Sequence, residues 1–164
     1  MGLKPALAAL AGLALGAAAC SPAATVAQTD PAKVEVGVHP ESGLEVVPVT
    51  ITQGTDSWTF AAEVAATSEQ QQRGLMFRTH LGPNEGMIFP RDPPRVASFW
   101  MKNTVIPLDM IFVGPDGRIL NIARETTPYS QESWFSDGPA SAVFEIAGGR
   151  AAELGIEPGA LVEW

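Results

Sequence analysis

Residues 98–113 read SFWMKNTVIPLDMIFV, and this stretch decides the fold of the chain. From Leu108 to Val113 both odd and even positions are apolar except Asp109, so both faces of the expected strand are buried. An unpaired, ionised carboxylate in such surroundings would cost several kcal/mol. We therefore expect Asp109 to be paired with a cation, hydrogen-bonded or protonated.

The sequence on both sides of this stretch predicts a mainly β domain over residues 44–164. Residues 44–52 and 58–64 are rich in β-branched and aromatic side chains and are expected to pair as a hairpin. The turn signal GPDG at 114–117 returns residues 118–124 antiparallel to 108–113. Further strands are expected at 87–89, at 142–147 and at the C-terminus. The fold class is α+β, with strands closing into a small barrel or sandwich and two short helices.

Both helices are short and have sequence signals at their ends. Thr67 followed by Gln70 matches a capping box, which predicts a helix over Ser68–Arg73 that Gly74 ends. A second helix is expected from 148 to 154. Prolines at 90, 93 and 94 are expected to interrupt strand pairing until residue 95, and residues 125–141 read as a long loop with aromatics.

Composition limits the class of protein. The chain has 164 residues, of which 46% are hydrophobic and 17% charged, which fits one domain with a core and a tail. The net charge of −8 and the absence of a basic run argue against nucleic-acid binding. Cys20 is the only cysteine, so neither an internal disulfide nor a cysteine-based metal cluster is expected.

The N-terminus has the pattern of an export signal. Residues 1–20 begin with one lysine and continue as a small, apolar run that is too short to span a bilayer. The run ends at Cys20, as in bacterial lipoproteins, so we expect Cys20 to be lipidated and to anchor the protein to a membrane, facing the periplasm. Ser21 favours the outer membrane. Residues 21–43 are expected to be a flexible tether with at most one short strand, around Val34, Val36 and Val38. Simple cleavage after Ala27 is the alternative.

Five motifs carry a resemblance to a known family. They are RGLMFR at 73–78, GMIF at 86–89, FWMKNT at 99–104, PLD at 107–109 and Glu145 before Gly148. Their order resembles the domain of unknown function family 192 (DUF192) across residues 44–164. The resemblance implies a compact, mainly β domain that is often exported or lipid-anchored in bacteria, and it implies no activity.

The candidate site consists of polar and aromatic residues within these motifs. They are Arg73, Arg78, Trp100, Lys102, Asn103, Asp109 and Glu145. One interpretation is a buried ion network without a ligand. The other is a pocket in which arginine or lysine holds an anionic group and Trp100 stacks on a flat or sugar-like face. We favour non-catalytic binding of a small molecule, a glycan or another envelope component.

Two other functions stay open from the sequence. Asp109 and Glu145 could form the acid pair of a glycan hydrolase, which requires both carboxyl groups at one cleft. Alternatively the protein could be a structural envelope lipoprotein with an exposed apolar patch. No Ser-His-Asp set at a telling spacing is present, and His39 reads as a surface residue. The methionines at 76, 87, 101 and 110 are interpreted as core packing, so no metal and no cofactor are predicted.

Overall fold

The computed structural model describes residues 1–2, 34 and 36–164. The expected signal peptide, Cys20 and most of the expected tether lie outside these residues. The elements are β1 (Gly37–Val38), β2 (Glu45–Gln53), β3 (Asp56–Val64), α1 (Ser68–Arg73), β4 (Glu85–Phe99), β5 (Leu108–Val113), β6 (Ile119–Thr126), β7 (Trp134–Ala147), α2 (Arg150–Glu153) and β8 (Leu161–Glu163). Neither α1 nor α2 has the length and apolarity that a membrane span requires.

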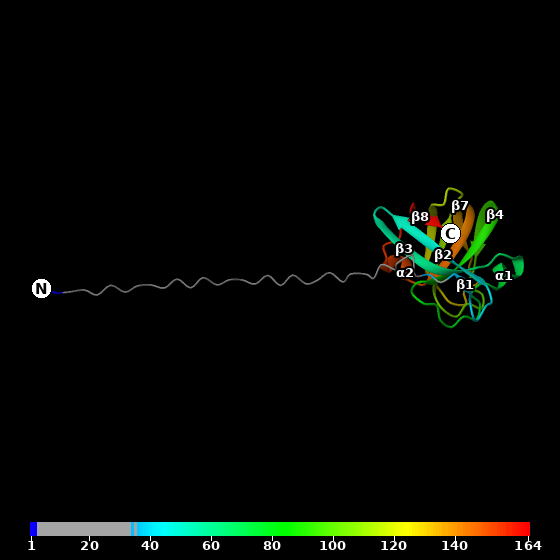
Figure 1. Cartoon of the computed structure of the whole chain (residues 1–164), viewed down its shortest axis with the longest axis horizontal. Helices are drawn as coiled ribbons and strands as arrows, with labels where there is room; N and C mark the ends of the chain where they lie inside the picture. Colours follow the sequence, from blue (N-terminus) through cyan, green and yellow to red (C-terminus); the bar gives the residue numbers. More distant parts are fainter. Residues whose placement is uncertain (3–33, 35) are drawn as a thin grey trace.

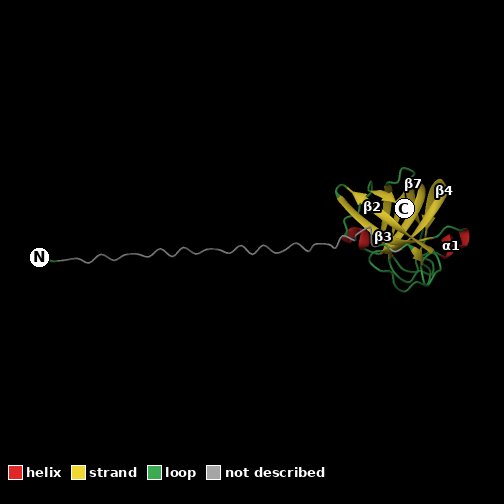
Figure 2. Ribbon diagram, in the orientation of Figure 1, coloured by secondary structure: helices red, strands yellow, loops and turns green. Residues whose placement is uncertain are grey.

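The strands form one curved sheet, and the two helices lie at opposite sides of it (Figures 1 and 2). The strand order is β1-β2-β3-β4-β7-β5-β6, and β8 pairs with β2. The expected mainly β domain with two short helices is confirmed. The sheet does not close into a barrel: β8 pairs with β2 over three residues, while residues 117–119 and 159–162 are joined by a few backbone hydrogen bonds and an isolated bridge between Arg118 and Leu161.

One connection in the sheet positions the candidate site. All paired strands are antiparallel except β3 and β4, which are parallel. A parallel pair needs a long crossover between its strands, and residues 65–84, which include α1, provide it. Leu75 and Leu81 of this crossover are buried in the same core cluster as Met87 and Phe89 of β4. The crossover therefore covers one face of the sheet.

Side chains that alternate along the central strands separate two core clusters. Phe144 and Ile146 of β7 belong to a cluster with Phe60, Ile111 and residues of α2. Val143 and Ala147, on the other face of β7, pack in a cluster with Met87, Met110 and Phe112. Both faces of β5 are fully buried, as the sequence predicted. The face on which a β7 residue lies therefore decides which cluster it joins.

The structure extends two strands beyond the expected bounds. Pairing of β4 with β7 shifts register between Pro90 and Arg95, so the prolines interrupt the ladder where they were expected to. Beyond that shift, residues 95–99 of β4 pair with 134–140, which the sequence assigned to a loop. The Gly37–Val38 strand also pairs with β2, so the folded part includes residues of the expected tether.

Candidate functional site

Three adjoining hollows lie beside the crossover, and Arg73 and Met76 line all three. The Arg78 hollow, of about 600 Å³, lies between residues 41–44 and α1. The Asn103 hollow, of about 460 Å³, has Trp100 and Lys102 in its wall. The Glu145 hollow, of about 230 Å³, lies over the sheet and is lined by aromatic rings as well as Trp100 and Lys102. We call the three together the Arg73 cleft.

The end of α1 and the loop after β4 form the walls of the cleft. The capping box at Thr67 is present and Gly74 ends the helix, so α1 has the predicted bounds. A Cβ atom at Gly74 would lie 3.3 Å from the Phe89 ring, which leaves little room for a side chain there. Phe77 has φ 65° and donates its N–H to the Asn103 carbonyl oxygen at 2.8 Å, and Asn103 has φ 57°. Backbone strain of this kind is common in binding loops.

The cleft gathers cationic side chains that have no acidic partner. Among the described residues, Arg78, Arg124 and Arg150 form ion pairs, whereas Arg73, Arg91 and Lys102 form none. The Lys102 ammonium lies 5.1 Å from the centre of the Trp100 ring, and the Arg91 guanidinium lies 5.4 Å from that of Phe99. Burial, and secondarily the charge of Arg95, lower the pKa of Arg91. Unpaired cations next to aromatic rings suit an anion with a flat apolar part.

Glu145 lies at the floor of the Glu145 hollow. Its side chain is 4% exposed and forms no hydrogen bond or ion pair with the described residues. The residues paired with it across the sheet are Met87 of β4 and Met110 of β5, both buried. Burial among these neighbours raises the pKa of the Glu145 carboxyl to about 8. At pH 7 the group is therefore mainly uncharged, and a protonated carboxyl can donate one hydrogen bond.

Asp109 lies outside the cleft and is fully buried. Its carboxylate accepts three backbone hydrogen bonds, from the N–H groups of Glu125 at 2.7 Å, Gly149 at 3.0 Å and Ala151 at 2.8 Å. Of the three alternatives expected for Asp109, a cation partner, hydrogen bonds or protonation, the structure shows hydrogen bonds. The carboxylate joins β5 to β6 and to the start of α2, which makes it a structural residue.

The two carboxyl groups of the hydrolase hypothesis do not share a cleft. Glu145 pairs with Met110, so Glu145 lies on the face that the crossover covers. Asp109 is the neighbour of Met110 on the strand and therefore lies on the opposite face, opposite Ile146. A pair acting on one glycosidic bond must flank that bond. The geometry therefore excludes Asp109 and Glu145 as the acid pair of a glycan hydrolase, although the sequence suggested both residues.

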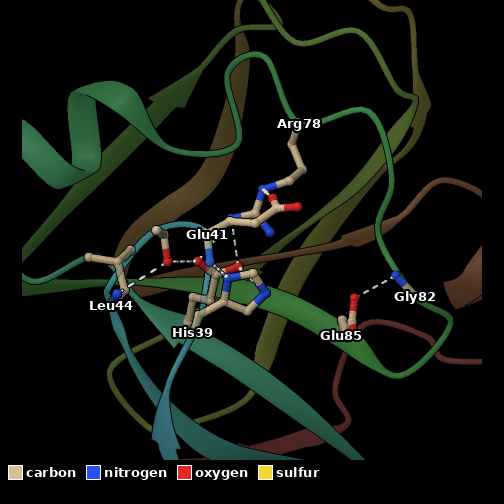
Figure 3. A network of polar contacts seen from close by, with 8 residues as sticks. His39, Glu41, Leu44, Arg78, Gly82 and Glu85 are labelled. Carbon is tan, nitrogen blue, oxygen red and sulfur yellow. Dashed lines mark hydrogen bonds and ion pairs between the residues drawn. The ribbon is translucent and has the colours of Figure 1, made fainter.

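A polar network that the sequence did not predict closes the side of the Arg78 hollow (Figure 3). Arg78 pairs with buried Glu63 at 2.9 Å and with Glu41 at 3.4 Å. Ser42 donates a hydrogen bond to Glu63, and the Nε2 atom of His39 lies 3.7 Å from the Glu63 carboxylate. His39, expected at the surface, is therefore part of a network that fastens residues 39–42 to the sheet and the crossover.

The seven candidate residues do not form one ion network. No described ion pair joins two of them. Arg73, Trp100, Lys102 and Asn103 come together at the cleft with Glu145, and Arg78 lies on its far side. Met76 lines the cleft, while the other three methionines named above are buried. Within the described part of the chain, no three His, Cys, Asp or Glu side chains are grouped to hold a metal ion.

Comparisons with known proteins agree with the motifs. The DUF192 family model, described as "Uncharacterized ACR", matches residues 49–164. A protein of unknown function from Novosphingobium aromaticivorans is similar in structure, with a TM-score of 0.80 and 53% identity over 85% of this chain and 99% of its own. A protein from Sinorhizobium meliloti with the provisional name of transcription regulator has a TM-score of 0.71 and 32% identity over 73% and 94%. No curated protein matches the chain.

Proposed function

The chain belongs to the DUF192 family, and from the chemistry of its cleft we propose that it is a non-catalytic binding protein for a small molecule with an anionic group and a flat or sugar-like face. Arg73 and Lys102 hold the anionic group, and Trp100 stacks on the rest of the ligand. The observation that carries the proposal is the group of three unpaired cations, Arg73, Arg91 and Lys102, in one cleft.

The cleft holds unpaired cations although the chain as a whole has an excess of acids. Acids outnumber bases 18 to 10 in the chain, so an arginine has many carboxylates with which it could pair. An anionic ligand would supply the missing counter-charge, and a guanidinium binds a carboxylate or phosphate through two parallel hydrogen bonds. Trp100 is 46% exposed at the same place, which leaves ring surface for a ligand to cover.

Substitution of cleft residues tests this proposal. We expect Arg73→Ala and Trp100→Ala each to weaken ligand binding about tenfold or more. Arg73→Ala removes a hydrogen bond to a charged group, which contributes about 1.5–3 kcal/mol, and Trp100→Ala removes the ring on which the ligand stacks. The measurement is the ligand-induced shift in melting temperature across a panel of metabolites and glycans. A bound ligand raises the melting temperature, and the weaker variants show a smaller rise.

Two matched variants serve as controls. Trp164 is 48% exposed, close to the 46% of Trp100, but lies at the C-terminus and does not line the cleft. Arg118 lies beside β6, where it donates to the Gly159 carbonyl oxygen. We expect Trp164→Ala and Arg118→Ala to bind as the wild type does. Equal shifts in all four variants, or a panel without any ligand, would contradict the proposal, and the second result would favour a structural envelope role.

The regulator name of the Sinorhizobium protein gives little support to a role on DNA. Binding to a phosphate backbone requires clustered lysine and arginine side chains. This chain has a net charge of −8, and three of its unpaired cations, Arg73, Arg91 and Lys102, line a cleft. A small molecule therefore fits the charges better than a nucleic acid does.

We further propose that the protein is exported to the periplasm and held at a membrane, most simply the outer membrane, by a lipid on Cys20. The support is the apolar run of small residues that ends at this cysteine. Radiolabelled palmitate should be incorporated into the wild type and into Ser21→Ala, and the label should be lost in Cys20→Ser. Labelling that persists in Cys20→Ser would contradict a lipid on Cys20, and a wild type without label would favour simple cleavage after Ala27.

A further inference from the structure

Glu145 differs from the other buried acids of the described structure because it has no partner. Asp109 accepts three backbone N–H groups, and Glu63 binds Arg78 and Ser42. Glu145 is only 4% exposed, and its side chain lines the Glu145 hollow without a hydrogen bond to any described residue. A buried polar group without a partner costs stability. Since Glu145 keeps its carboxyl group in spite of this loss of stability, a bound ligand could supply the missing hydrogen-bond partner.

The charged groups around Glu145 define what such a ligand carries. Arg73 faces the hollow from α1, Arg91 from β4 and Lys102 from the loop that follows β4. None of them forms an ion pair with Glu145. From β4 and β5 the flanking side chains are methionines, which do not titrate. Glu145, whose pKa burial raises to about 8, is therefore the group in this hollow that changes charge near neutral pH.

We propose that protonated Glu145 donates a hydrogen bond to a carboxylate of the ligand, while Arg73 and Lys102 supply the positive charge. The inference rests on the proposed function and narrows it to carboxylic acids with a flat apolar body. One carboxylate oxygen accepts from the Glu145 O–H, and the other accepts from a cation. The apolar body extends past Trp100 into the Asn103 hollow, which shares Arg73, Trp100 and Lys102 with the Glu145 hollow.

The proposal makes binding dependent on pH in a defined direction. Below about pH 8 Glu145 carries the proton that it donates. Above that pH an ionised Glu145 would repel the ligand carboxylate, and the hydrogen bond would be lost. The affinity for a carboxylate should therefore decrease as the pH rises from 6.5 to 9.

The probe is 2-naphthoate, with 2-naphthamide as its uncharged counterpart, measured by tryptophan fluorescence and isothermal titration calorimetry on the full chain. We expect wild-type affinity for 2-naphthoate to fall about tenfold between pH 6.5 and 9, since one pH unit above the pKa leaves about a tenth of the group protonated. The amide should bind at least about tenfold more weakly than the acid at pH 6.5.

Two variants of Glu145 separate the effect of its hydrogen-bond donor from the effect of filling the buried site. Glu145→Gln retains an N–H donor that does not titrate, so its affinity at pH 6.5 should stay near that of the wild type and should not change up to pH 9. Glu145→Leu fills the apolar site without a donor and should bind weakly at both pH values. Melting temperatures at pH 6.5 check that both variants are folded.

The outcomes distinguish this inference from the proposed function. If Glu145→Gln keeps the wild-type pH dependence, if Glu145→Leu binds as the wild type does, or if wild-type affinity does not change with pH, the role of Glu145 is wrong. Absence of 2-naphthoate binding at pH 6.5 overturns the carboxylate class. A panel ligand whose affinity falls in Arg73→Ala and Trp100→Ala would still support the cleft as a binding site in each of these cases.

Discussion

Replacing Asp109 by alanine should lower the free energy of unfolding by about 3–5 kcal/mol, because three backbone N–H groups around this buried side chain would lose their acceptor at once. Asp109→Asn should have roughly half this effect. Its amide keeps one oxygen as an acceptor, while its NH₂ group faces a donor that cannot accept a hydrogen bond. Urea denaturation of the purified protein measures both differences.

The control for Asp109 is an exposed aspartate. The Asp137 side chain forms no hydrogen bond or ion pair with the described residues, so Asp137→Ala should stay within about 0.5 kcal/mol of the wild type. If Asp109→Asn had wild-type stability but bound no ligand, Asp109 would belong to the binding site, and the structural role given to it here would be wrong.

The second large effect concerns Glu145 and the dependence of stability on pH. The carboxyl ionises near pH 4.5 without burial, and burial raises its pKa to about 8 in the folded protein. Between these values the folded state retains a proton that the unfolded state has released, so the free energy of unfolding decreases as pH rises. The contribution is complete below pH 4.5 and is lost by the time the pH has passed 8. Its size is about 5 kcal/mol.

Glu145→Gln has no proton to release at this position. Relative to the variant, the wild type should therefore lose stability by this amount between pH 4.5 and 9, as measured by urea denaturation at intervals of one pH unit. Glu132→Gln, at an exposed position, should follow the wild type at every pH. Parallel curves for the wild type and Glu145→Gln would show that Glu145 ionises normally in the folded state.

Local sequence signals predicted the elements whose ends are marked by particular residues. The capping box at Thr67 and Gln70 gave α1 its bounds, and the turn at 114–117 joined β5 to β6. The first half of β7 was assigned to a loop because its serines, glycine and proline are typical of loops. It forms a strand because residues 95–99 of β4 lie beside it and accept its backbone hydrogen bonds. Such pairing between distant segments is not visible in a local pattern.

The sequence predicted only part of the candidate site, namely the residues whose motifs lie on neighbouring loops. Arg73, Trp100 and Lys102 were expected together and line one cleft. The sequence could not separate Asp109 from Glu145, because the faces on which they lie follow from the register of β5 with β7. The sequence did not identify Glu63 as a site residue, because apolar and polar residues alternate along its strand and this pattern indicates that Glu63 faces solvent. The crossover covers that face, and Arg78 comes from the crossover to pair with it.

The pairing of β8 with β2 sets an order in which the domain can be completed. Residues 161–163 pair with residues 50–52, so strands from the two ends of the folded region must meet. A contact across such a separation closes a long loop and is slow to form. A chain emerging in the N-to-C direction, from a ribosome or through a translocation channel, cannot make this contact before residues 161–163 appear. Until then the edge of β2 at residues 50–52 stays open to water, to chaperones or to another chain.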